Sequence, residues 1–127
     1  MHTPRMILFD YGETLVHERG FDGVRGSEAV LRYAVQNPHN LNGAQVQALA
    51  DRLNEQIGRY APATRDSVLT EVHNRQFHRY LYERLDLEFS LDSEALEAIF
   101  WDVACPGEPT PGIHALLGEL RRQGIRT

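Results

Sequence analysis

The sequence predicts an α/β chain that is mostly helical, and three observations support this fold class. A short apolar run at residues 6–9 ends in a polar turn, which is typical of a buried strand. Between residues 27 and 103, apolar residues recur at spacings of three and four, the pattern of amphipathic helices. A proline-rich segment at 105–111 and one further amphipathic helix follow. With 127 residues, of which 42% are hydrophobic, the chain is about one domain in length and can build one modest core.

The first expected element is the strand at 6–9, which places Asp10 directly at its carboxyl end. Residues 17–26 then change to mainly charged and glycine residues, so we expect a linker or hinge there. Ser27 is a suitable N-cap for a first helix, and Pro38 ends this helix because proline cannot continue it.

Three more helices complete the expected helical region. Asn42 and Gln45 have the spacing of a capping box at the start of the second helix, which Pro62 ends. A third helix is expected over 66–85, and Asp92 can cap a fourth. Four amphipathic helices with short connections predict a small bundle.

The last part of the chain carries clear start and stop signals. The prolines within 105–111 force extended backbone and predict a second linker, which carries the chain back towards the first strand. Thr110 is expected to cap a fifth helix with Pro111 at its first position, and Gly124 follows the end of this helix. Residues 125–127 have the composition of a strand that is only beginning.

Composition and charge exclude several classes of function. The net charge is −5 and the pI is near 5.6, so nothing predicts a surface for nucleic acid. No stretch approaches the roughly 20 apolar residues that cross a bilayer, and the first apolar run is too short for a signal peptide. We therefore expect a cytoplasmic protein without membrane or nucleic-acid partners. Cys105 is the only cysteine and all 13 cationic residues are arginine, which excludes an intrachain disulfide and any chemistry that needs a lysine amine of this chain.

Asp10, Gly12 and Thr14 form the pattern that can carry chemistry. A carboxylate at the carboxyl end of a strand lies where open α/β sheets bind ligands, and it suits a nucleophile or a metal ligand. Gly12 allows the backbone to turn sharply, and Thr14 can hydrogen-bond the loop. From the spacing alone, an ordinary turn is the commoner explanation.

The run Met-Ile-Leu-Phe-Asp-Tyr-Gly-Glu-Thr-Leu from Met6 to Leu15 resembles motif I of the haloacid dehalogenase (HAD) superfamily, an apolar strand followed by Asp-x-Asp-x-Thr-Leu. The layout of the chain is similar to that of members with a helical C1-type cap between motif I and motif II. The resemblance implies a Rossmann-type core, of which only the first strand and one helix are present, and an inserted four-helix-bundle cap. The implied domains are the first strand and motif I loop at 1–16, the cap with its hinge linkers at 17–107, and the return helix of the core at 108–127.

The resemblance further implies phosphatase-type hydrolysis of a small phosphorylated metabolite through an aspartyl intermediate. Asp10 would be the nucleophile and, together with the backbone carbonyl of Gly12, a ligand to Mg²⁺. Thr14 matches the threonine of the motif. Tyr11 lies inside the motif, where its ring either shapes substrate access or covers the end of the strand.

Gly12 is the first departure from the family pattern, because it replaces the second aspartate, which in the phosphatase branches protonates the leaving group. General acid–base help is worth roughly 10²- to 10⁴-fold, so its loss predicts a slow phosphatase. The dehalogenase and phosphonatase branches also lack this aspartate, which leaves hydrolysis of another substrate class open. Glu13 is a weaker candidate for the missing acid, since its side chain is expected to point elsewhere.

The second departure concerns the remaining motifs. The family's motif II serine or threonine, its lysine and its final acidic pair would all lie beyond Thr127, and this chain contains no lysine. We therefore expect a chain that is truncated before motif II and inactive alone, with a second copy or the missing C-terminal core segment as its partner. The alternative is a non-catalytic helical module for binding or assembly, in which motif I is a relic.

Two further groups of side chains could contact a substrate. Arg75 and Arg79 are spaced i,i+4, and they either bind an anionic substrate or form a solvated face paired with Glu71 and Glu83. His17 is the histidine near the motif loop, and it is the one we would test for substrate contact.

Overall fold

The structure is a computed structural model that describes residues 4–59 and 72–127. Over this part of the chain the protein is mostly helical, as the sequence predicts, and it holds two small two-stranded sheets. None of the described helices is both long enough and apolar enough to span a bilayer.

The chain divides into two compact units. Met1–Phe21 and Pro106–Thr127 form one, here called the motif unit, and Asp22–Cys105 forms the other, here called the helical unit. The divisions follow residues 21 and 105, whereas the domain limits expected from the sequence follow residues 16 and 107.

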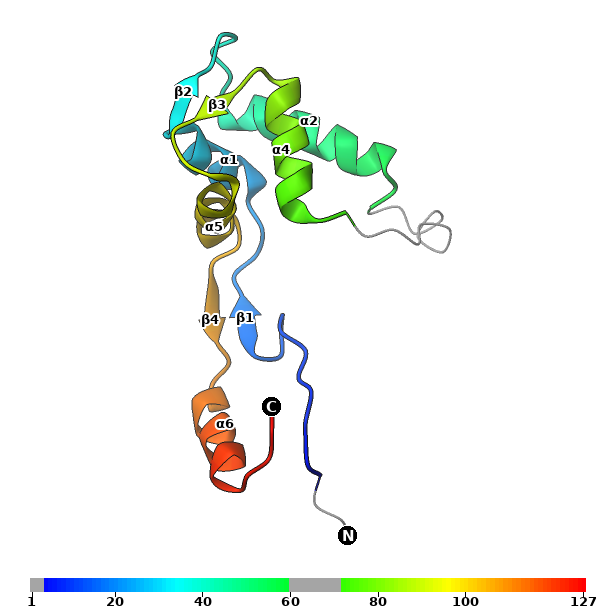
Figure 1. The fold of residues 1–127 in the computed structure, drawn as a ribbon, viewed down its shortest axis with the longest axis vertical. Coiled ribbons are helices and arrows are strands. Elements are labelled where there is room, and N and C mark those ends of the chain that lie inside the picture. The colour runs from blue at the N-terminus through cyan, green and yellow to red at the C-terminus, as the bar shows by residue number, and fades with distance from the viewer. Residues whose placement is uncertain (1–3, 60–71) are drawn as a thin grey trace. The chain divides into compact units, whose positions relative to one another are not determined.

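The helical unit combines helices with a small antiparallel sheet (Figure 1). In chain order the elements are helix α1 (Gly23–Leu31), strand β2 (Ala34–Gln36), helix α2 (Gly43–Gln56), helix α4 (Asn74–Arg84), strand β3 (Glu88–Phe89) and helix α5 (Ser93–Ala104). Strands β2 and β3 pair with each other, and their register is irregular between Ala34 and Gln36.

Helix α1 packs against both α5 and α2. Gly26 allows the close approach to α5, because a Cβ there would lie 2.7 Å from the Cβ of Ala104 and 2.9 Å from the ring of Phe100. The resulting core brings together buried side chains from the four described helices of the helical unit, and their burial is the main stabilising contribution to this unit. The buried members are Val30, Val46, Ala50, Leu53, Phe77, Leu81, Tyr82, Leu87, Leu96, Phe100 and Ala104.

The start of the first helix differs from the prediction. Asp22 is its N-cap, and its carboxylate accepts a hydrogen bond from the backbone N–H of Arg25 at 3.0 Å. Ser27, the predicted cap, is buried inside α1. The linker predicted over 17–26 is therefore wrong in its last part, because Asp22 supplies the better-placed cap and Gly26 serves helix packing rather than flexibility.

The end of the first helix also differs from the prediction. Helix α1 ends at Leu31, well before Pro38, and residues 34–36 form strand β2 instead. This strand pairs with β3, which comes much later in the chain. The pairing satisfies backbone groups that a longer helix would have satisfied locally, so a tertiary contact overrides the local helical pattern.

Two helix caps predicted from the sequence are confirmed. Asn42 and Gln45 make both hydrogen bonds of a capping box, each at 3.0 Å. The carboxylate of Asp92 accepts hydrogen bonds from the backbone N–H groups of Glu94 and Ala95.

The second and third helices can be compared with the prediction in part. Helix α2 ends at Gln56, with Ile57 as its C-cap and Gly58 in a left-handed conformation, so the prediction of a helix up to Pro62 is wrong in its last part. Pro62 itself lies outside the described residues.

Helix α4 begins at Asn74, with His73 as its N-cap, and ends at Arg84, next to the predicted limit. The prediction of one helix over 66–85 is wrong at residues 72–73, which are not helical, because His73 has an extended backbone and caps α4. The expected start at residue 66 lies outside the described residues.

The motif unit contains one antiparallel pair of strands and one helix (Figure 1). Strand β1 (Val16–Glu18) pairs with strand β4 (Gly107–Pro109), with Val16 opposite Pro109 and Glu18 opposite Gly107. The proline-rich segment is therefore extended, as predicted. Helix α6 (Ile113–Arg122) follows β4.

The predicted strand at 6–9 is reduced to one parallel bridge between Met6 and Arg126. The N–H of Ile7 donates to the carbonyl of Arg126 at 2.8 Å, and the N–H of Arg126 donates to the carbonyl of Arg5 at 3.2 Å. The chain thus returns to its first segment, as the sequence predicts. The prediction of a buried strand is wrong, because Leu8 is 85% exposed.

The N-terminus of the fifth predicted helix differs from the expectation. Gly112 occupies the N-cap position of α6 with a φ of 83°, a left-handed conformation that glycine adopts without strain. Thr110, the predicted cap, lies two residues earlier, where its N–H donates to the carbonyl of Leu15 and its carbonyl accepts from the N–H of Ile113. The link to the segment before β1 holds Thr110 in the extended strand region, and Pro111 lies in the turn between strand and helix.

Candidate functional site

Asp10 follows the first segment of the motif unit, and its side chain is exposed to solvent. The segment before it has a parallel neighbour, because Ile7 and Arg126 are joined by a backbone hydrogen bond. The strand pair β1–β4, the helical unit and helix α6 lie between these two segments in the chain. Asp10 therefore follows a segment whose described pairing is this single parallel bridge.

A tight turn follows Asp10 and holds the motif residues together. The backbone carbonyl of Tyr11 accepts hydrogen bonds from the N–H groups of Thr14, Leu15 and Val16, at 3.4, 2.9 and 3.1 Å. Thr14 is thus fixed in the loop through its backbone N–H. The backbone path directly after Asp10 is consequently well defined by local hydrogen bonds.

Glu13 stabilises this turn in a way that the sequence analysis did not identify. Its φ of 56° lies in the left-handed region, which is uncommon for residues other than glycine. Its carboxylate accepts a hydrogen bond from the N–H of Glu18 at 2.9 Å and lies 2.9 Å from Nδ1 of His17. The spacing of four residues between Glu13 and His17 was the available signal, but it predicts a contact only in a helix.

These contacts also decide whether Glu13 can replace the missing acid. The hydrogen bond from the Glu18 N–H, together with the nearby His17, lowers the pKa of Glu13 below its ordinary value. A general acid needs a raised pKa, so the environment of Glu13 opposes this role. His17, the histidine with a suggested substrate contact, is engaged with the same carboxylate.

Gly12 has space for a side chain. The nearest atom that a Cβ at this position would meet is a carboxylate oxygen of Glu18 at 3.3 Å, the far end of a flexible side chain. The φ of Gly12 is not in the left-handed region, in contrast to that of Glu13. The backbone therefore does not require glycine here, and an aspartate can be introduced.

The side chains of Tyr11 and Thr14 are exposed. Tyr11 is 66% exposed, which favours a role at the surface of the site over a role in covering the end of the first segment. With Asp10 these residues form one exposed loop, which is the part of the predicted site that the structure brings together.

The strand pair β1–β4 supports the loop from its far end. The side chains of Arg19 and Glu108 form an ion pair across the two strands, and the N–H of Arg19 donates to the carbonyl of Pro106 at 3.1 Å. The hydrogen bond and charge of Glu108 raise the pKa of Arg19. Both side chains are solvent-exposed, so the ion pair orients the strands more than it stabilises them.

The oxygens available for a cation in this loop are few. Within residues 4–59 and 72–127 there is no group of three or more His, Cys, Asp or Glu side chains placed to hold a metal ion. The Asp10 carboxylate and the Gly12 carbonyl are the two ligands that the sequence resemblance predicts. Mg²⁺ takes six oxygens in octahedral geometry, so these two do not make a complete site.

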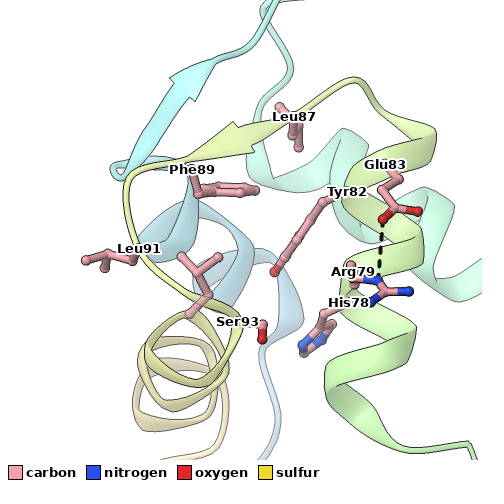
Figure 2. A pocket seen from close by; sticks show the side chains of 9 residues that line it. His78, Arg79, Tyr82, Glu83, Leu87, Phe89, Leu91 and Ser93 are labelled. Carbon is pink, nitrogen blue, oxygen red and sulfur yellow. Dashed lines mark ion pairs between the residues drawn. The ribbon is translucent and has the colours of Figure 1, made fainter.

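Arg75 and Arg79 are engaged on the surface of the helical unit. Arg75 forms ion pairs with Glu97 at 2.8 Å and with Glu94 at 3.4 Å, and Arg79 pairs with Glu83 at 3.4 Å beside a pocket of the helical unit (Figure 2). Of the two alternatives, both arginines therefore fit the solvated face of ion pairs, and the partners of Arg75 lie on α5. Glu71, the partner expected for Arg75, lies outside the described residues.

Comparisons with known proteins do not add an assignment to this geometry. Searches among protein families, curated proteins and solved structures found no match to the chain.

Proposed function

We propose that the protein is a HAD-like hydrolase that uses Asp10 as a nucleophile on a small phosphorylated metabolite. The observation that carries the proposal is the position of Asp10, an exposed carboxylate between a segment with a parallel backbone partner and a tight turn. The resemblance of residues 6–15 to motif I gives this carboxylate its role. Support thus comes from the sequence and from the local backbone together.

In the proposed reaction, a carboxylate oxygen of Asp10 attacks the phosphorus atom. The bond between phosphorus and the leaving oxygen breaks, and the leaving group departs with the electron pair. Water then hydrolyses the aspartyl phosphate, which releases inorganic phosphate and regenerates Asp10. An exposed carboxylate is accessible to a substrate, and the hydrogen bonds of the Tyr11 carbonyl fix the loop that presents it.

The proposal includes Mg²⁺ as the ion that would neutralise charge on the phosphoryl oxygens. Asp10 and the carbonyl of Gly12 are its proposed ligands in this chain. Proteins often bind Mg²⁺ through one or two carboxylates, and water and substrate phosphate complete the coordination. The remaining oxygens would therefore come from outside the described residues.

The substrate class follows from the missing acid. Gly12 cannot protonate a leaving group, and the environment of Glu13 opposes this role. The loop then favours substrates whose leaving groups are stable as anions, such as aryl or acyl phosphates, over phosphate esters of simple alcohols. A halogenated acid would meet the same requirement, because the halide leaves as a stable anion when the carboxylate attacks the carbon atom.

The test is release of phosphate from p-nitrophenyl phosphate by the full natural polypeptide, with Mg²⁺ present. We expect Asp10→Asn to abolish turnover, since the amide is a poor nucleophile. Asp22→Asn is the matched control, because Asp22 caps α1 in the helical unit and lies outside the motif loop. Equal turnover by the Asp10→Asn variant and the unmodified protein would refute the proposal.

The second candidate function is a non-catalytic helical module for binding or assembly. Gly12 favours it, because the motif lacks one of its two acidic groups. The helical unit also has its own buried core, which a binding module requires. Absence of Asp10-dependent turnover on aryl phosphates, acyl phosphates, phosphonates and haloacids would favour this module.

A further inference from the structure

Glu13 has a backbone conformation that is unusual for its residue type. Its φ of 56° lies in the left-handed region, where a residue with a Cβ is strained. The other two described non-glycine residues with a positive φ are Asn40 and Asp86, whose short polar side chains favour this region. A glutamate lacks this local advantage, so a further interaction must hold Glu13 in the left-handed conformation.

This interaction takes place on the edge of strand β1 that strand β4 leaves open. On the edge that faces β4, the carbonyl of Leu15 and the N–H of Arg19 form backbone hydrogen bonds with the returning chain. The backbone groups of successive residues point to opposite edges of a strand. Those of Val16 and Glu18 therefore face the open edge, where Glu13 contacts them.

The turn after Asp10 covers this open edge. The carbonyl of Tyr11 accepts from the N–H of Val16 at 3.1 Å, and the N–H of Glu13 donates to the carbonyl of Val16 at 2.7 Å. The carboxylate of Glu13 continues the pattern, because it accepts from the N–H of Glu18 at 2.9 Å. The side chain of Glu13 thus acts in place of a backbone carbonyl on this edge and ties the turn to β1.

The hydrogen bond from the Glu13 N–H fixes the direction of the Gly12 carbonyl. Both groups belong to one peptide unit, and no peptide bond in the described residues is cis. In a planar trans unit, the C=O and the N–H point in opposite directions. The Gly12 oxygen therefore points away from Val16, and no described residue donates a hydrogen bond to it. This oxygen is consequently accessible to a cation, which takes carbonyl oxygens as ligands.

We propose that Glu13 is a positioning residue of the candidate site. Its carboxylate holds residue 13 in the left-handed conformation, and this conformation directs the carbonyl of Gly12 as a ligand for Mg²⁺. The inference rests on the proposed function, because that function gives the Gly12 carbonyl its role. Glu13 itself would contact neither the substrate nor the ion, since its carboxylate oxygens are engaged by Glu18 and His17.

The first measurement is amide hydrogen exchange, followed by NMR, on the full natural polypeptide and on two variants. Glu13→Ala removes the carboxylate, so the amides of Glu18 and of residue 13 should exchange about tenfold faster, as expected for the loss of one hydrogen bond. Glu13→Gln keeps a side-chain oxygen for the N–H of Glu18, so both amides should remain slow. Glu119→Ala is the matched control, because Glu119 is also a hydrogen-bonded glutamate of the motif unit but belongs to α6.

The second measurement is a titration of the same proteins with Mg²⁺ in the absence of substrate, followed by the NMR signal of the Gly12 carbonyl carbon. Mg²⁺ should shift this signal in the unmodified protein, and Glu13→Ala should weaken the affinity about 10- to 100-fold, as is common for groups that orient a metal ligand. Glu13→Gln should restore the affinity. If Glu13 acted only through its charge, both variants would bind Mg²⁺ equally weakly, so the restoration separates positioning from attraction.

Three results would overturn the positioning role. They are unchanged exchange of the Glu18 amide in Glu13→Ala, absence of a Gly12 carbonyl shift with Mg²⁺, and equal Mg²⁺ affinity of the Glu13→Ala and Glu13→Gln variants. Neither measurement requires turnover, so failure of the proposed hydrolysis is distinguishable. A Gly12 shift that depends on Glu13, without any Asp10-dependent release of phosphate, would support the positioning role and contradict the hydrolysis.

Discussion

Gly12 is the position at which an aspartate of the motif can be introduced and its effect on hydrolysis measured. A Cβ at this position meets only the flexible end of Glu18, and the backbone is not left-handed. We expect Gly12→Asp to place an acid close to Asp10. The rate of phosphate release from esters with poor leaving groups should then rise by about 10²- to 10⁴-fold. Release should be measured with an alkyl phosphate and with p-nitrophenyl phosphate.

The comparison between these substrates is the control for Gly12→Asp. An aryl leaving group needs little protonation, so its hydrolysis should rise much less than that of the alkyl ester. A decrease for both substrates would show that the loop does not place this carboxylate near the leaving group.

His78 predicts how stability depends on pH. Burial lowers its folded-state pKa below the ordinary value of 6.5, a nearby Glu97 opposes this shift and Arg59 adds to it. Below about pH 6.5 the unfolded chain therefore binds a proton that the folded chain does not. The free energy of unfolding falls as the pH is lowered from this value to the folded-state pKa. At higher pH this contribution is constant.

His78→Phe should remove this loss of stability at acidic pH. It should also stabilise the protein by about 1 kcal/mol at neutral pH, because it removes a buried polar atom without a described partner. Urea unfolding between pH 5 and pH 8 checks both effects, with His114→Phe as the control. A pH dependence that is the same in His78→Phe and in the unmodified protein would contradict the assignment.

Within single elements, the glycine in α1 has a packing role. An added methyl group at Gly26 would overlap Ala104 and Phe100 of α5, at 2.7 and 2.9 Å. Gly26→Ala should therefore lower the free energy of unfolding by about 1–3 kcal/mol, although alanine has the higher helix propensity.

Gly118 in α6 is the matched control, because an added Cβ there meets nothing within 4 Å. Gly118→Ala should stabilise its helix by up to about 1 kcal/mol. Urea unfolding of both variants, followed by circular dichroism, measures the difference. If Gly26→Ala were as stabilising as Gly118→Ala, the close contact between α1 and α5 would not exist.

The elements also show how much of the fold could be predicted from the sequence. The caps at Asn42 and Asp92 could be predicted because a cap is a local interaction between neighbouring residues. Strand β2 could not, because its partner β3 is distant in the chain and the local pattern resembles a helix. Threonine is a residue type that often caps helices, which is why Thr110 was the predicted cap. Its backbone N–H instead donates to the carbonyl of Leu15, a distant contact that no local pattern indicates.

The same distinction applies to the candidate site. Its residues are close together in sequence, so their gathering in one loop could be predicted. The contact of Glu13 with His17 and Glu18 could not, because it depends on a left-handed backbone at a glutamate. The parallel neighbour of the first segment was predicted only as a return of the chain, and the structure gives its register at Arg126.

For the chain as a whole, we expect the first segment to determine association. Met6 and Leu8 are 46% and 85% exposed, and the described parallel pairing of this segment is a single bridge to Arg126. An exposed apolar edge pairs readily with another chain. We expect this polypeptide to associate through residues 6–9 or to aggregate, and we expect Leu8→Arg to reduce this association.

Light scattering at increasing protein concentration measures the effect. Val35→Arg is a suitable control, because Val35 is also exposed, at 67%, but belongs to strand β2 of the helical unit. A clean monomer at high concentration, or an equal response to both substitutions, would contradict a role of the first segment in association.

The proposed role of Asp10 as a nucleophile is tested most directly by the intact mass of the full natural polypeptide quenched in acid during turnover of p-nitrophenyl phosphate. We expect a species heavier by one phosphoryl group, with the added mass on the peptide that contains Asp10. Asp10→Asn should show no such species. A phosphoryl group on another residue, or none while phosphate is released, would contradict the claim.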